Sequence, residues 1–135
     1  MIVVDENLQN RQLIAEIATW YKGQVVSVLT LRPTTLIHDD SITLLLQQVR
    51  HPTFVTINVV DFWLKAQANS AYSIVAIALP QSQSHRVPVV LRDLLNQPEF
   101  RTKAARMGKV IHVMPTYIEY YGTNRQIRTL TWPDD

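Results

Sequence analysis

The sequence contains no cysteine, which excludes disulfide bonds and thiolate metal sites and is compatible with a cytoplasmic protein. Only three of its 135 residues are glycine, too few for either of the glycine-rich loops that cradle nucleotide phosphates. No apolar run reaches the length of about 18 residues that a membrane-spanning helix needs. The first residues lack the basic start and long apolar stretch of a signal peptide, so we expect a cytoplasmic chain that does not enter a membrane.

What is present describes one folded domain over residues 1–135, with 47% hydrophobic residues and a net charge of only +2. The charge is unevenly distributed. The stretch 85–109 carries six Lys or Arg residues and two acidic residues. Such a stretch is either a solvated helix surface or a surface that faces phosphates.

Apolar strands alternate with amphipathic segments along the chain, which is typical of a parallel sheet covered by helices. We expect strands at 1–4, 25–29, 53–57 and 72–79, a long strand over 109–121 and a returning strand over 125–132. We expect one helix between Leu13 and Tyr21 and a second from a cap at Asp40 or Ser41 to about Val49, with a loop over 30–40 before it. A short helical turn is expected over 61–66, a helix over 87–96, and another short helix that ends near Gly108. The pattern predicts an α/β fold: a three-layer α/β/α sandwich around a mainly parallel sheet, with a C-terminal antiparallel hairpin.

Acidic and amide side chains follow the expected strands. Asp5 comes after the first strand, and Asn58 and Asp61 come after the third. Asp40 lies where the helix that leads into the third strand begins. If the first and third strands are neighbours, these residues meet at the carboxyl edge of the sheet, where α/β proteins place their functional groups. Converging carboxylates of this kind suit Mg²⁺ or Mn²⁺.

Each of these residues also has a structural interpretation that the sequence leaves open. Asp5 can accept backbone hydrogen bonds in its turn or cap the first helix, and Asp40 is a good helix cap. Asn58 and Asp61 can stabilise a turn through their own backbone.

The motifs taken together resemble the short bacterial PIN-like domains, relatives of the PIN ribonucleases that include toxins of toxin–antitoxin pairs. The resemblance rests on "VVDENL" (3–8), "HDDSITLLLQQ" (38–48) and "FVTINVVDFW" (54–63), and a weaker similarity continues through "RVPVVLRDLL" and "GKVIHV". It implies a divalent-metal-dependent endoribonuclease that hydrolyses RNA phosphodiesters with Mg²⁺ or Mn²⁺.

By this resemblance the metal ligands are Asp5, Asp40 and Asp61, and Asn58 is a further catalytic residue that orients a ligand or water. RNA contacts are expected from basic residues of the 85–109 stretch, namely Arg86, Arg92, Arg101 and Lys103. A homodimer and an antitoxin-like protein partner are also implied. Asn58 stands where the family usually has an aspartate, and the turn between Thr56 and Phe62 is one residue longer.

The alternative is therefore a catalytically degenerate PIN-like module that acts through protein contacts, using the "YIEYYG" hairpin and the "VPVVLRDLL" helix. A phosphoryl-accepting receiver domain fits less well, because it needs an aspartate at the end of the third strand, where Ile57 and Asn58 stand.

Overall fold

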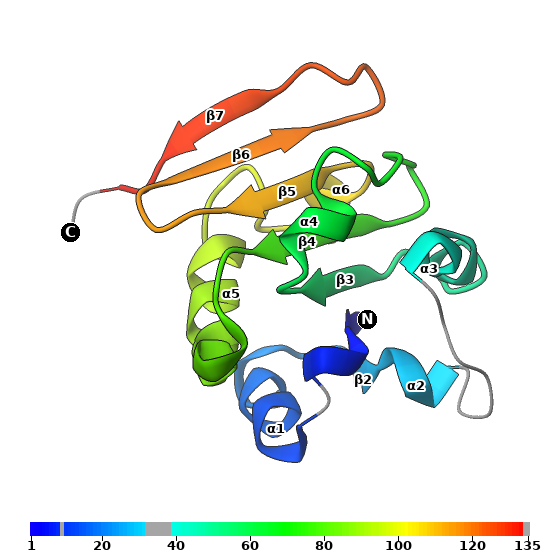
Figure 1. Cartoon of the computed structure of the whole chain (residues 1–135), viewed down its shortest axis with the longest axis vertical. Coiled ribbons are helices and arrows are strands. Elements are labelled where there is room, and N and C mark those ends of the chain that lie inside the picture. The colour runs from blue at the N-terminus through cyan, green and yellow to red at the C-terminus, as the bar shows by residue number, and fades with distance from the viewer. Residues whose placement is uncertain (9, 32–38, 134–135) are drawn as a thin grey trace.

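The fold is built on a sheet of seven strands in the order β2-β1-β3-β4-β5-β6-β7 (Figure 1). This computed structural model describes residues 1–8, 10–31 and 39–133. The strands are β1 (Ile2–Val4), β2 (Val25–Ser27), β3 (Thr53–Thr56), β4 (Ser73–Ile77), β5 (Val110–Val113), β6 (Tyr117–Tyr121) and β7 (Arg128–Thr131). The helices are η1 (Glu6–Leu8), α1 (Arg11–Trp20), α2 (Val28–Leu31), α3 (Asp39–Leu46), α4 (Val59–Phe62), η2 (Gln81–Arg86), α5 (Val87–Leu95) and α6 (Lys103–Arg106).

The sheet is mixed but mostly parallel. Strands β1 to β5 pair in parallel, and β6 and β7 add an antiparallel hairpin at one edge. Figure 1 shows the arrowheads of β3, β4 and β5 on the same side of the molecule. The α/β class, the mainly parallel sheet and the C-terminal hairpin that the sequence predicted are thus confirmed.

Apolar side chains from both faces of the sheet form two core clusters. Ile2 and Val4 of β1 belong to one cluster, together with residues of α1 and α5, whereas Val3 belongs to the other, with residues of α3 and α4. This split follows from the alternation of side chains along a strand. Most apolar residues of α5 are buried in the first cluster, so that helix offers little of the partner surface that the degenerate-module alternative requires. No helix of the described ranges combines the length and apolar character needed to cross a membrane.

The strand order creates a switch point between β1 and β3. The chain leaves β1 toward β2 on one side and then crosses back to β3 on the other, so neighbouring connections diverge at the carboxyl ends of these two strands. The β1–β3 ladder continues one residue beyond β1, because the Asp5 backbone N–H donates to the Val55 carbonyl at 2.9 Å. Open α/β sheets bind their ligands at such a point.

The second strand is shorter in the structure than the sequence predicted. Residues 25–29 were predicted as a strand, but β2 ends at Ser27 and the short helix α2 follows. The Ser27 hydroxyl accepts a hydrogen bond from the Leu29 backbone N–H at 3.2 Å, which starts the helix. The remainder of the expected loop, 32–38, lies outside the described residues.

Several further boundaries differ from the prediction, among them a helix expected to about Val49 that ends at Leu46 and strands expected over 72–79 and 125–132 that are shorter at both ends. Helix α3 begins at Asp39, so the predicted caps Asp40 and Ser41 lie inside its first turn. Helix α4 begins at Val59 rather than at residue 61, because Asn58 caps it. The long strand predicted over 109–121 is two strands: the Met114 backbone N–H donates to the Tyr117 carbonyl at 2.9 Å, which closes a tight turn between β5 and β6.

Candidate functional site

The Asp5 carboxylate lies at the switch point and is almost fully buried, with 3% of the residue exposed. Its Oδ1 accepts from the Glu6 backbone N–H at 2.8 Å. Its Oδ2 accepts from the Thr56 hydroxyl at 2.6 Å, a contact that joins the residue after β1 to the last residue of β3. The parallel pairing of β1 with β3 therefore holds Asp5 in one orientation.

Burial is the largest influence on the charge of Asp5. It raises the pKa of the Asp5 carboxyl above its ordinary value, and the nearby charges of Glu6 and Asp61 act in the same direction. The hydrogen bonds from Thr56 and from the Glu6 N–H oppose this effect and lower the pKa. A cation near Asp5 would favour the ionised carboxylate.

A chain of hydrogen bonds connects Asp5 to the other predicted residues of this edge. Thr56 Oγ1 accepts from the Asn58 backbone N–H at 2.9 Å. Asn58 Oδ1 accepts from the Asp61 N–H at 3.3 Å, and Asn58 Nδ2 donates to Asp61 Oδ2 at 2.7 Å. Asp5, Asn58 and Asp61 are thus brought together, and the residue that connects them is Thr56, which the sequence analysis did not select as a site residue.

The structural interpretations of these residues also apply. Asp5 accepts a backbone hydrogen bond in its turn, but α1 is capped by Asn10 instead. Asn58 caps α4 through its side-chain oxygen. Lys65 Nζ lies 3.9 Å from Asp61 Oδ1 at the surface. The sequence analysis did not predict this contact.

Carboxylate and carboxamide oxygens gather at this edge of the sheet. The described residues contain no group of three or more His, Asp or Glu side chains placed to hold a metal ion. The backbone of Asp40 belongs to the first turn of α3, but its side chain lies outside the described part of the chain. Asn7 Oδ1, two residues after Asp5, is buried and accepts no hydrogen bond from any described donor. A carboxamide oxygen in this state fits a hard cation or its water.

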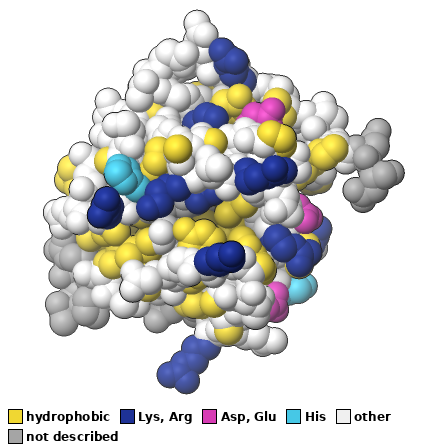
Figure 2. Space-filling model, turned by 180° about the vertical axis from the view of Figure 1, so that it is seen from behind, with side chains coloured by type: hydrophobic (Ala, Val, Ile, Leu, Met, Phe, Trp, Pro, Cys, Tyr) yellow, Lys and Arg dark blue, Asp and Glu magenta, His cyan; other side chains and the backbone are white. Residues whose placement is uncertain are grey.

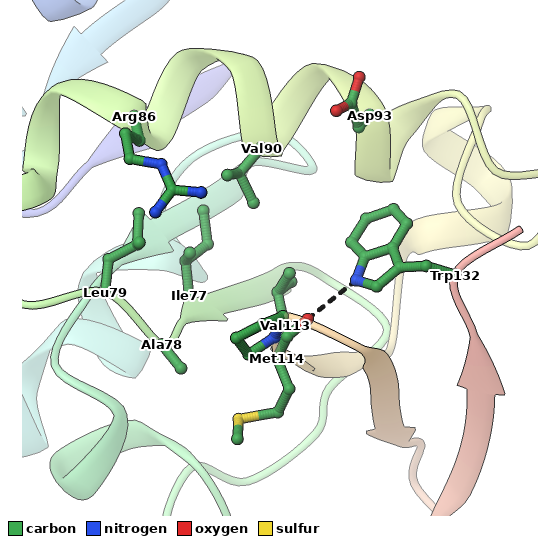
Figure 3. Close-up of a pocket in the computed structure, with 10 residues that line it drawn as sticks. Ile77, Ala78, Leu79, Arg86, Val90, Asp93, Val113, Met114 and Trp132 are labelled. Atoms are coloured by element: carbon green, nitrogen blue, oxygen red, sulfur yellow. Dashed lines mark hydrogen bonds between the residues drawn. The ribbon is translucent and has the colours of Figure 1, made fainter. Parts of the chain in front are cut away.

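A pocket of about 290 Å³ opens at the carboxyl ends of β4 and β5, on the α5 face (Figure 3). Arg86 and Asp93 reach it from the two ends of the covering helical segment, and Trp132 closes the opposite side. The Trp132 indole Nε1 donates to the Met114 carbonyl at 2.8 Å. Thr56 follows Val55, which points to the α5 face, so by strand alternation the Asp5–Thr56 pair lies on the other face.

The predicted RNA contacts fall into two places. Arg86 lines the pocket at the carboxyl edge, whereas Arg92, Arg101 and Lys103 line a hollow of about 410 Å³ at the amino edge. The hollow lies at the amino edge because α1 ends there before β2, and α5 and α6 end there before β5.

Sequence reasoning missed two cations of this hollow, Lys22 and Arg106, and its aromatic residues Trp20 and Tyr21. We call this region the basic hollow, made of Lys22, Arg92, Arg101, Lys103 and Arg106 with Trp20 and Tyr21. About 70 residues separate Lys22 from Arg92 in the chain, so no local spacing could have grouped them. Figure 2 shows Lys and Arg side chains in a band across the middle of the rear face, with the few Asp and Glu side chains toward one side.

Comparison with known proteins adds no relative: no protein-family model, curated protein or solved structure matches this chain.

Proposed function

We propose that this chain is a PIN-like, divalent-metal-dependent endoribonuclease with a three-layer α/β/α fold. Asp5, Asp61 and Asp40 would hold Mg²⁺ or Mn²⁺, and Asn58 would orient Asp61. The observation that carries the proposal is the buried Asp5 carboxylate, bound to Thr56 at the switch point between β1 and β3.

A buried carboxylate at this place favours a metal site over a purely structural role. Removing an ionised group from water is unfavourable unless it is paired or hydrogen-bonded, and within the described part of the chain the Asp5 carboxylate has only a hydroxyl and a backbone N–H as donors. Asp61, in the turn that follows β3, carries a charge of the same sign and raises the pKa of Asp5 further. Two carboxylates that interact unfavourably without a cation are the expected precursor of a divalent site.

The residues of the chain have distinct roles in this proposal. Asp5 is fixed by Thr56, and Asp61 is fixed by the Asn58 amide, so both carboxylates are oriented before an ion arrives. Asp40 would approach from α3, whose first turn precedes β3 in the chain. The bound ion would supply an activated water and stabilise the charge that develops on the scissile phosphate.

The alternative, a PIN-like module without nuclease activity, is favoured by one observation. The Asn58 amide already donates to Asp61 Oδ2, and Lys65 lies near the other oxygen, so the charge of Asp61 is partly compensated without a metal. The toxin–antitoxin role, the homodimer, the antitoxin-like partner and the cytoplasmic location remain predictions from the resemblance.

The test compares three purified proteins: the wild type, Asp5→Asn, and Glu16→Gln as a matched control that removes one exposed charge from α1. Each is incubated with labelled single-stranded RNA and Mn²⁺, and Mn²⁺ binding is measured by calorimetry. We expect the wild type and Glu16→Gln to bind the ion and cleave RNA, and Asp5→Asn to do neither.

Equal cleavage by Asp5→Asn would refute the assignment of the site. If the wild type binds no Mn²⁺ at millimolar concentration and does not cleave RNA, the degenerate module is the correct description.

A further inference from the structure

We propose that the basic hollow at the amino edge of the sheet binds the backbone phosphates of single-stranded RNA, at a site distinct from the acidic residues. The choice of RNA as the ligand rests on the proposed function, but the binding itself needs neither a metal nor cleavage.

The first argument is that the positive charges of the hollow are uncompensated. Its lining includes five Lys or Arg residues and no Asp or Glu. Among the described residues, salt bridges join Lys65 to Asp61 and His112 to Glu119, and none involves a cation of the hollow. Like charges gathered in a concave surface concentrate anions from solution.

Arg106 gives the second argument, because it is a buried cation with neutral partners. It is 3% exposed. Its Nε donates to Thr53 Oγ1 at 3.2 Å, and its Nη1 donates to the carbonyl oxygens of Phe100 and Arg101 at 3.0 and 3.1 Å. No described carboxylate pairs with it, and burial lowers the pKa of its guanidinium. A buried guanidinium of this kind is stabilised by an anion in the adjoining space.

One nitrogen of the Arg106 guanidinium, Nη2, remains outside these hydrogen bonds. Nη2 donates to no described acceptor, and it is not among the buried side-chain atoms that lack a partner, so it keeps contact with solvent. Arg106 is one of the residues that line the hollow, so a phosphate bound there would lie beside this guanidinium. A free N–H pair on a guanidinium that is held rigidly by three other hydrogen bonds is a preorganised phosphate donor.

The other four cations of the hollow are exposed, and they would extend the site along a strand of phosphates. Arg101 Nη2 donates to the Asn96 carbonyl at 3.0 Å, which fixes its side chain at the end of α5. Arg92 and Lys103 are exposed and form no hydrogen bond or ion pair through their side chains with described residues. Such side chains can follow a flexible polyanion.

Aromatic residues beside the cations favour single-stranded nucleic acid over a small anion. Trp20 and Tyr21 lie at the hollow with their rings edge to face, 6.4 Å between centroids. Both rings are half-buried against the core, and a base can stack on the part that remains accessible while the backbone follows the basic groups. Duplex bases are stacked on one another and do not offer this contact.

The basic hollow and the acidic site lie at opposite ends of β3. Thr53, bound by Arg106, starts the strand, and Thr56, bound to Asp5, ends it. The two threonines are three residue steps apart along the strand, which is about 10 Å at roughly 3.3 Å per residue. The hollow is therefore an anchoring surface for RNA and not part of the reaction centre.

The experiment measures binding of a labelled single-stranded RNA oligonucleotide by fluorescence anisotropy over a range of salt concentrations, with a chelator present. The test variant is Arg92→Gln/Lys103→Gln, two exposed positions of the hollow. The matched control is Arg11→Gln/Arg125→Gln, which removes the same charge from two exposed positions outside the hollow. Thermal melts of each protein confirm that it is folded.

We expect the test variant to lower the salt dependence of binding, the slope of log K against log salt, by about 1.4, because each single-strand phosphate contact contributes about 0.7. At about 0.1 M salt this corresponds to an affinity about 25-fold weaker. The control should keep the wild-type slope to within about 0.3. Pyrophosphate should compete with RNA only weakly, since it cannot reach several cations and the aromatic rings together.

Two results would overturn the proposal. One is an equal loss of RNA affinity in the test variant and the control. The other is a wild-type protein that does not bind RNA, and tight pyrophosphate binding by that protein would assign the hollow to a small phosphate ligand. Because no metal is present, RNA binding without cleavage would leave this proposal intact even if the nuclease proposal fails.

Discussion

The Thr56 hydroxyl offers the most direct test of the physical argument at the acidic edge. It is fully buried, it donates to Asp5 Oδ2 at 2.6 Å, and it accepts from the Asn58 N–H at 2.9 Å. Thr56→Val keeps the branched shape and removes both hydrogen bonds. A hydrogen bond to a charged group contributes about 1.5–3 kcal/mol and a neutral one about 0.5–1.5 kcal/mol, so we expect a loss of about 3 kcal/mol at neutral pH.

Most of this loss should depend on the charge of Asp5. The hydroxyl lowers the pKa of Asp5 against the larger effect of burial, so the folded-state pKa rises further when the hydroxyl is removed. A carboxyl group whose pKa is higher in the folded than in the unfolded protein stabilises the fold at pH values below its unfolded-state pKa, about 3.9. This stabilisation is lost as the pH rises through the folded-state pKa. The difference between the wild type and Thr56→Val should therefore be small near pH 3, about 1 kcal/mol, and should grow toward neutral pH.

Urea unfolding measures this difference, and Thr56→Ser is the matched control because it retains the hydroxyl. We expect Thr56→Ser to lose less than about 1.5 kcal/mol, from the missing methyl group alone. In the Asp5→Asn background, Thr56→Val should cost about half as much as in the wild type. An equal cost in both backgrounds, or an equal loss for serine and valine, would contradict the role given to this hydrogen bond.

Three further predictions concern the core and the backbone. Leu91→Ala removes a fully buried side chain of α5, so we expect urea titrations to show a free energy of unfolding lower by about 2–5 kcal/mol. A loss under about 1 kcal/mol would contradict the place of Leu91 in the core. Gly108 has φ +85, and the nearest atom to an added Cβ is Ser70 Cα at 3.8 Å, so Gly108→Ala should cost about 1 kcal/mol from backbone strain alone. Burial raises the pKa of Tyr121 to about 12, so absorbance titrations of the wild type and Tyr121→Phe should coincide below about pH 11 and separate above it.

Local sequence was sufficient for most of the secondary structure. Continuous apolar runs predicted the buried strands β1, β3 and β4, and alternation of these runs with helical patterns predicted the α/β class. The errors lie where a single polar contact overrides the pattern. The Ser27 hydroxyl starts α2 inside an apolar run, and the turn after Met114 interrupts a stretch that otherwise has strand composition.

The candidate site was predicted in part, since Asp5, Asn58 and Asp61 follow strands that proved to be neighbours. The sequence by itself determined which residues end the strands, because periodicity and turn residues act over a few positions. Only the tertiary structure decided that Thr56 binds Asp5 and that Lys22 shares a hollow with Arg106. Those pairs are set by the register of β1 against β3 and by the packing of α1 beside α5, which depend on contacts between segments far apart in the chain.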